Sequence, residues 1–187
     1  MGVDLASLGE PVRRPARREG STLTLGYLGT LDAGRRLGVL IEMLADLRSS
    51  GMQTRLLLIG DSSSPRDRQA LLTQARDLGV AEHLEITGML PRQEAMARMR
   101  DADIGLSPIF RSPILDVGSP TKLVEYLAMG LPVVANHHPE QRAILDACRA
   151  GVCVPWGARH FARAVRWLAQ LPPARIAAMG MEGRRWA

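Results

Sequence analysis

The chain has 187 residues, 46% of them apolar and 23% charged, which is typical of one globular domain with a full hydrophobic core. It contains no run of about 18 apolar residues and no apolar segment after Met1, so we expect neither a transmembrane helix nor a secretory signal. The net charge of +5 permits an anionic partner, but an aromatic content of only 4% argues against a nucleic-acid partner, which would need a stacking surface. Cys148 and Cys153 match no zinc or redox spacing, and we expect a reducing cytoplasm.

Residues 1–21 show little periodicity and contain four arginines between positions 13 and 18, which predicts a solvated interdomain hinge or linker. Contact of these arginines with a membrane surface is the alternative. Residues 22–187 carry regular patterns and form the predicted domain. Its apolar runs are typical of buried strands, which we expect at 23–29, 54–60, 84–88, 103–107, 133–135 and 152–155.

Segments with helical periodicity separate these runs. They lie at 36–49, 65–78, 92–102, 119–130 and 139–150, and continue up to the C-terminus. Strand and helix alternate about six times, so we predict an α/β fold with a doubly wound, Rossmann-like parallel sheet of about six strands and helices on both faces. Ligands of such sheets bind at the carboxyl ends of the strands. The segments Gly29-Thr30, Gly60-Asp61 and Gly88-Met89 are expected to meet there.

The stretch 118–134 predicts a loop, a helix, a second loop and a short strand. Ser119 is expected as the N-cap of the helix and Pro120 as its first residue. Gly130 is placed to end the helix in the left-handed conformation. The apolar run that follows continues into the fifth predicted strand.

Lys122 is the only lysine of the sequence, and it falls in the first turn of this helix. Its charge opposes the positive end of the helix dipole, an arrangement that is favourable only when an anion lies between them. Glu125 lies on the same helix face, so a diphosphate and a sugar hydroxyl would use both residues. An ordinary surface pair between Lys122 and Glu125 is an equally good interpretation.

Lys122, two residues and then Glu-Tyr-Leu-Ala-Met-Gly-Leu-Pro-Val-Val resembles the nucleotide-sugar motif of family-4 retaining glycosyltransferases, which have the GT-B fold. The resemblance implies that the start of the helix meets the donor diphosphate and that Glu125 holds the nucleotide ribose. The residues implied at the helix start are Gly118, Ser119, Thr121 and Lys122.

That motif also has a first glutamate, separated from the second by seven residues. The corresponding position here is Val117, with Asp116 one residue earlier. Either Asp116 contacts the donor sugar, or the backbone around Gly118 and Ser119 does so, which is the interpretation that we prefer.

Gly29-Thr30-Leu31 followed by Arg35 resembles the family segment Gly-Arg-Leu, three residues, Lys, in which the Arg and Lys clamp the donor phosphates. Thr30 replaces the Arg. Arg35 stands at the Lys position, keeps the charge and can bind phosphate through two hydrogen bonds. The resemblance therefore implies Lys122 and Arg35 as catalytic cations that stabilise the leaving diphosphate. The alternative is that Arg35 and Arg36 are ordinary solvated residues.

The segment Gly88-Met89-Leu90-Pro91 resembles the family loop whose backbone contacts the base, which adds Met89 to the implied donor site. Taken together, the resemblance implies the donor-binding half of an enzyme that transfers a sugar from a UDP- or GDP-sugar with retention of configuration. The N-terminal acceptor-binding domain would lie outside this chain, which would then be inactive alone. The resemblance implies no metal or other cofactor. We expect a cytoplasmic protein at the inner face of the cell membrane.

Three alternatives remain. A GT-B-type nucleotide-sugar epimerase would need further acid–base groups, and only His137 and His138 offer them. A non-catalytic nucleotide-binding module would suit the departures at Thr30 and Val117. A dinucleotide-binding oxidoreductase should show G-x-G-x-x-G after the first strand, and Gly26-Tyr-Leu-Gly does not match. The base, the sugar, the acceptor and the oligomeric state are left open.

Overall fold

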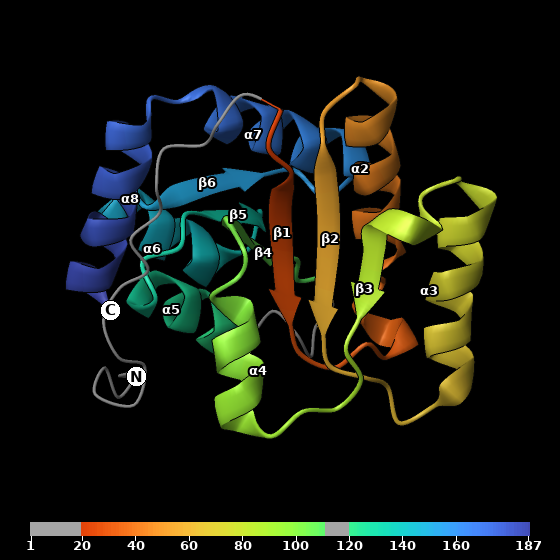
Figure 1. Ribbon diagram of the computed structural model, residues 1–187. Coiled ribbons are helices and arrows are strands. Elements are labelled where there is room, and N and C mark those ends of the chain that lie inside the picture. Colours follow the sequence, from red (N-terminus) through yellow and green to blue (C-terminus); the bar gives the residue numbers. More distant parts are fainter. Residues whose placement is uncertain (1–19, 111–119) are drawn as a thin grey trace.

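The structure is a computed structural model that describes residues 20–110 and 120–187. Figure 1 shows it as a ribbon, with the remaining residues in grey. The predicted linker up to residue 19 lies outside the described residues, as do Asp116, Val117, Gly118 and Ser119.

All six predicted strands form one parallel sheet (Figure 1). The strands are Leu23–Leu28 (β1), Thr54–Ile59 (β2), Leu84–Ile86 (β3), Ile104–Ser107 (β4), Val133–Asn136 (β5) and Gly151–Val154 (β6). Their order is β3-β2-β1-β4-β5-β6, so the direction of winding reverses between β1 and β4. The carboxyl ends of the strands at such a reversal form the crevice in which ligands of these sheets bind.

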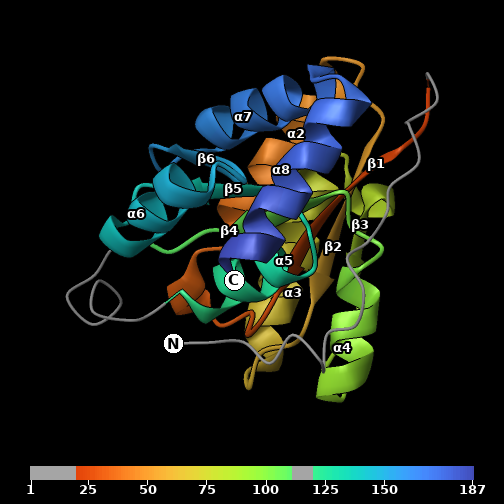
Figure 2. The same ribbon diagram turned by 90° about the vertical axis from the view of Figure 1, so that its left-hand side faces the viewer.

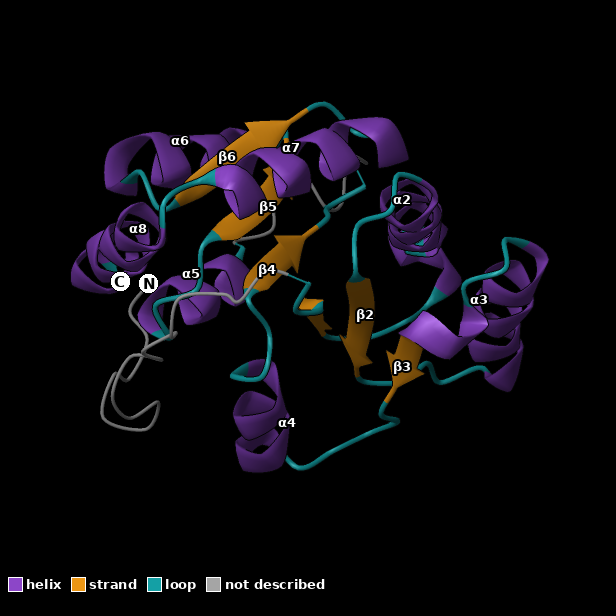
Figure 3. Ribbon diagram, turned by 45° about the horizontal axis from the view of Figure 1, so that its top comes forward, coloured by secondary structure: helices purple, strands orange, loops and turns teal. Residues whose placement is uncertain are grey.

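Helices cover both faces of the sheet, as predicted (Figures 2 and 3). They are Gly38–Ser49 (α2), Pro65–Asp77 (α3), Arg92–Met99 (α4), Thr121–Ala128 (α5), Pro139–Cys148 (α6), Ala158–Gln170 (α7) and Pro173–Trp186 (α8), with 3-10 turns at Ala33–Arg35 (η1) and Ala81–His83 (η2). One hydrophobic core includes α2, α3 and α7, and the other includes α4, α5 and α6. α8 packs against α5 and α6.

The strand β2 shows why helices are needed on both faces. Leu56 and Leu58 enter one core, whereas Leu57 and Ile59 enter the other, because successive side chains of a strand point to opposite faces. Each of these four residues is at most 1% exposed. Burial of one such side chain contributes about 1.5–3 kcal/mol, so β2 stabilises the sheet only between two helical layers.

Two helices begin later than predicted. The helix expected from Arg36 begins at Gly38, because Arg36 adopts a left-handed conformation with φ of 51° after the turn η1. Pro120 is the N-cap of α5 rather than its first residue, so the predicted cap at Ser119 is wrong by one position. The end of α5 is confirmed: Gly130 has a φ of 75°.

Candidate functional site

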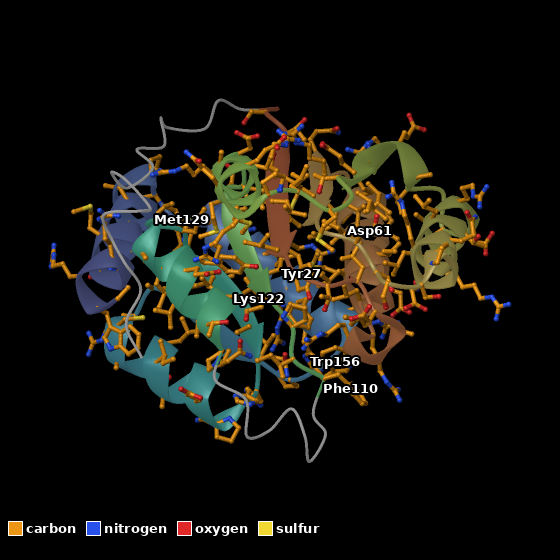
Figure 4. All side chains as sticks on the ribbon, turned by 90° about the horizontal axis from the view of Figure 1, so that it is seen from below. Tyr27, Asp61, Phe110, Lys122, Met129 and Trp156 are labelled. Atoms are coloured by element: carbon orange, nitrogen blue, oxygen red, sulfur yellow. The ribbon has the colours of Figure 1, made fainter. Side chains whose placement is uncertain are left out.

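Three glycines bring the ends of neighbouring strands together. Gly29, Gly60 and Gly88 follow β1, β2 and β3 and have φ values of 149°, 139° and 77°, in the region that favours glycine. A Cβ atom on Gly60 would lie 2.1 Å from the carbonyl oxygen of Gly29, so a side chain there would push the two loops apart. Gly60 and Gly88 form an isolated bridge. The loops of Gly29 and Met89 therefore lie along one edge of the sheet, which Figure 4 shows from below.

Lys122 extends from the first turn of α5 over the end of β1. Its Nζ atom lies 3.4 Å from Oη of Tyr27 and 5.1 Å from the centre of the Tyr27 ring. A Cβ atom on Gly29 would lie 2.2 Å from this Nζ, so a side chain there would displace the ammonium group from its position over β1. Figure 4 shows Lys122 and Tyr27 side by side. The fold thus places Lys122 against Gly29, as a shared phosphate site would require.

The ammonium group of Lys122 is poorly solvated. Burial lowers the pKa of Lys122 to about 8, and the positive charge of Arg35 also lowers it, while Glu125 and Asp32 oppose the shift. An anion bound beside the lysine would favour the protonated form. This electrostatic environment is typical of an anion-binding site.

Thr30 links Arg35 to the same tyrosine. Oη of Tyr27 donates a hydrogen bond to the carbonyl oxygen of Thr30 at 3.0 Å. Nε of Arg35 donates to Oγ1 of Thr30 at 3.3 Å. Burial raises the pKa of Tyr27 to about 12, so the hydroxyl remains a donor at neutral pH. Thr30 therefore orients Arg35, where the family resemblance would place a second cation.

Arg36, the neighbour of Arg35, is directed elsewhere. Its guanidinium carbon lies 3.9 Å above the centre of the Phe110 ring, a cation–π contact. Phe110 in turn meets Trp156 edge-on, with 5.3 Å between the ring centres (Figure 4). The two adjacent arginines thus belong to different parts of the edge, and Arg35 is the one beside Lys122.

Tyr126 holds α5 in the position that brings Lys122 to the edge. Its Oη accepts a hydrogen bond from the backbone N–H of Leu28 at 2.8 Å, so the helix is bonded to the last residue of β1. The ring packs over Gly105, where a Cβ atom would lie 2.7 Å from Cδ2 of Tyr126. This role of Tyr126 was not predicted, since a tyrosine in the motif carries no sign of a partner in a distant strand.

Glu125 forms an ion pair with Arg92 rather than with Lys122. Nη2 of Arg92 lies 2.8 Å from Oε1 of Glu125. The predicted alternative, a surface pair within α5, is therefore wrong. Arg92 was not identified from the sequence, although it follows directly the predicted base-contacting segment that contains Met89.

Met89 and Thr121 lie at the surface of the same edge. Met89 is 73% exposed, so its loop presents both backbone and side chain to solvent. Thr121 is the exposed first residue of α5, and among the described residues no side-chain hydrogen bond caps the start of that helix. The N–H groups of such an uncapped turn are available to an anion.

A separate hollow of about 640 Å³ lies between α2 and α7 and touches none of the predicted site residues.

Within residues 20–110 and 120–187, no three His, Cys, Asp or Glu residues are grouped to hold a metal ion. None of the helices in these two ranges is both long enough and apolar enough to cross a membrane.

Comparison with known proteins decides the family. A family model described as glycosyl transferases group 1 matches residues 22–170. The chain belongs to this family of glycosyltransferases. It is 29% identical to the putative colanic acid biosynthesis glycosyltransferase WcaL of Escherichia coli over 95% of this chain and 43% of the relative. It is 35% identical to the GDP-mannose-dependent alpha-(1-6)-phosphatidylinositol monomannoside mannosyltransferase of Mycolicibacterium smegmatis over 80% of this chain and 39% of the relative.

Solved structures agree with this glycosyltransferase fold. The C-terminal domain of the group 1 protein LpcC from Francisella tularensis superposes with a TM-score of 0.76 at 17% identity, covering 99% of this chain and 96% of that one. HepE from Anabaena, in complex with UDP and glucose, has a TM-score of 0.74 at 17% identity, covering 88% of this chain and 43% of that one. The chain spans less than half the length of the curated relatives that it matches.

Proposed function

We propose that this glycosyltransferase domain is the C-terminal, donor-binding domain of a family-4 retaining enzyme of GT-B fold. The full-length enzyme would transfer a sugar from a UDP- or GDP-sugar to an acceptor held by an N-terminal domain. One observation carries the proposal: within a group 1 chain, Gly29, Thr30, Arg35 and Lys122 meet at the carboxyl edge of the sheet.

The comparisons support the placement and the donor class. LpcC offers an isolated C-terminal domain that this chain covers almost completely. HepE structures contain UDP or UDP-glucose, and the Mycolicibacterium relative is described as GDP-mannose-dependent. Uracil and guanine are therefore the two bases that the proposal includes.

The proposed roles follow from the positions of the residues. Lys122, Arg35 and the N-terminal turn of α5 bind the donor diphosphate and stabilise the charge that develops on it as the sugar leaves. Gly29 and Thr30 form the turn beneath the phosphates, together with Thr121 at the helix start. The family resemblance adds Gly118 and Ser119, which lie outside the described residues. Glu125 accepts hydrogen bonds from the ribose, and the backbone at Met89 meets the base. The proposal includes no metal and no other cofactor.

We extend the proposal to the cytoplasm and to the inner face of the cell membrane. Two relatives are named as mannosyltransferases of phosphatidylinositol compounds, and a lipid acceptor of this kind would place the reaction of the full-length enzyme at a membrane surface. Partners of the full-length enzyme would be the nucleotide-sugar donor, the acceptor domain and the membrane surface, but not nucleic acid.

A thermal-shift panel of UDP, GDP, ADP and dTDP on this chain tests the proposal. A diphosphate at 100 times its dissociation constant should stabilise the fold by about 2.7 kcal/mol. For a domain of this size, that corresponds to a rise in Tm of roughly 5–10 °C. We expect this rise with UDP or GDP, and its loss in Lys122→Ala and Glu125→Ala.

Arg142→Ala is the matched control, because Arg142 is a basic residue whose side chain is 64% exposed and paired with Asp146 on α6. It should keep the full shift. A shift of equal size in wild type and Lys122→Ala would show that the diphosphate binds elsewhere, and the proposed site would be wrong.

A further inference from the structure

Arg92 joins two parts of the proposed donor site. It is the first residue of α4 and follows directly the loop of Met89, which is proposed to meet the base. Its guanidinium group contacts Glu125 of α5, which is proposed to hold the ribose, at 2.8 Å. The two residues are 33 positions apart, so the contact is a product of the fold.

The ion pair is asymmetric in its exposure. The side chain of Glu125 is only 12% exposed, whereas that of Arg92 is 69% exposed. A carboxylate withdrawn from water to this degree is unfavourable without a partner, but an arginine in solvent needs none. The ion pair therefore stabilises the charge of Glu125 more than that of Arg92.

Arg92 also leaves part of the carboxylate open. Within the described residues, the ion pair uses Oε1 of Glu125, and Oε2 has no hydrogen bond. The planar guanidinium group restrains the rotation of the carboxylate that it binds. A restrained carboxylate with one unoccupied oxygen is suited to accept hydrogen bonds from adjacent hydroxyl groups.

We infer that Arg92 is a positioning residue for ribose recognition, which orients the Glu125 carboxylate toward the hydroxyl groups of a ribonucleoside diphosphate and tethers the Met89 loop to α5. The inference rests on the proposed function and deepens it. It predicts that the site distinguishes ribose from deoxyribose and that Arg92 is responsible for a large share of that selectivity. A salt bridge with only a structural role would alter the free energy of unfolding but not the selectivity.

Isothermal titration of the whole chain with UDP and GDP, and with their 2′,3′-dideoxy forms, tests the inference. We expect wild type to bind the better of the two ribonucleotides at least tenfold more tightly than its dideoxy form. In Arg92→Ala the ratio should fall below threefold, because the ribonucleotide binds more weakly while the dideoxy form is nearly unaffected. Arg92→Lys should restore part of the ratio.

Arg98→Ala is the control, since Arg98 lies on the same helix but pairs with Glu85 and Asp101. It should keep the wild-type ratio. A wild-type ratio in Arg92→Ala, or an equal weakening of both ligands, overturns the inference while the proposed function stands. Failure of wild type to bind either diphosphate contradicts the proposed function and overturns the inference with it. Unfolding curves of each variant confirm that the folded chain was titrated.

Discussion

Lys122 occupies a position that is unfavourable for its charge. Burial against Tyr27 and the charge of Arg35 lower its pKa from 10.5 to about 8. Between these two values the folded chain binds fewer protons than the unfolded chain, so this residue makes stability rise with pH. The stability that the chain gains when Lys122 is neutral is lost as the pH falls through about 8. At neutral pH the lysine is charged and destabilises the fold.

Replacement of Lys122 by methionine should therefore stabilise the chain. The variant keeps the length of the side chain and removes the charge, so we expect the free energy of unfolding at pH 7 to rise on the order of 1–2 kcal/mol. Urea unfolding at pH 7 and at pH 9.5 measures the effect. The gain over wild type should be smaller at the higher pH, and a loss of stability at pH 7 would contradict this account of the lysine.

Tyr27→Phe should change the titration of Lys122. The variant keeps the ring but removes the oxygen that lies 3.4 Å from Nζ. Loss of this hydrogen-bond acceptor disfavours the charged form of Lys122 and should lower its pKa further. Because the chain contains a single lysine, lysine-selective labelling gives NMR signals from this residue alone. Diphosphate binding should weaken in parallel. An unchanged pKa would mean that the hydroxyl serves only the carbonyl group of Thr30.

At the scale of elements, α5 is held by two sets of contacts near its C-terminal end. Tyr126 bonds it to the backbone of β1 at Leu28. In the turn that ends the helix, the N–H of Gly130 bonds to the carbonyl of Leu127 at 2.9 Å and that of Leu131 to the carbonyl of Tyr126 at 3.0 Å, a Schellman motif. An eight-residue helix is too short to be stable alone, so these contacts fix the direction in which its first turn points.

Tyr126→Phe should destabilise the chain without creating a cavity. It leaves the N–H of Leu28 without its hydrogen-bond acceptor in a partly buried environment, at a cost of about 1–3 kcal/mol. Chemical denaturation would measure the loss, and circular dichroism would show that the helices are retained. A stability equal to that of wild type would mean that water or a backbone shift replaces the tyrosine oxygen.

At the scale of the molecule, α8 packs closely against the end of α5. A Cβ atom on Gly180 would lie 2.4 Å from the carbonyl oxygen of Gly130, and one on Gly183 would lie 2.8 Å from Cβ of Ala150. Nη1 of Arg184 donates a hydrogen bond to the carbonyl group of Ala128, at the end of α5. The helix that follows all six strands thus supports the element that carries Lys122.

Gly180→Ala tests this packing. The added methyl group meets backbone that cannot move freely, so we expect a loss of about 1–3 kcal/mol in the free energy of unfolding. Met181→Ala, at a neighbouring position that is 43% exposed, should remain within about 0.5 kcal/mol of wild type. Equal stabilities of the two variants would show that α8 tolerates displacement from α5.

Local patterns in the sequence were sufficient for the fold class. Each strand is a short apolar run and most helices have a clear apolar face, so all six strands and the parallel doubly wound sheet were predicted correctly. The motif around Lys122 and the end of its helix at Gly130 also follow from residues close in sequence. These features depend on periodicity and on the conformational range of glycine, which neighbouring residues determine.

The tertiary structure alone decided which side chains meet. Tyr27 and Lys122 are separated by 95 residues, Leu28 and Tyr126 by 98, and Arg92 and Glu125 by 33. No periodic pattern relates such positions, because their contact depends on strand order and on the packing of α4 and α5 over the sheet. The sequence by itself therefore determined the sheet and the motif, whereas the charge environment of Lys122 and the partner of Glu125 arose only when the chain folded.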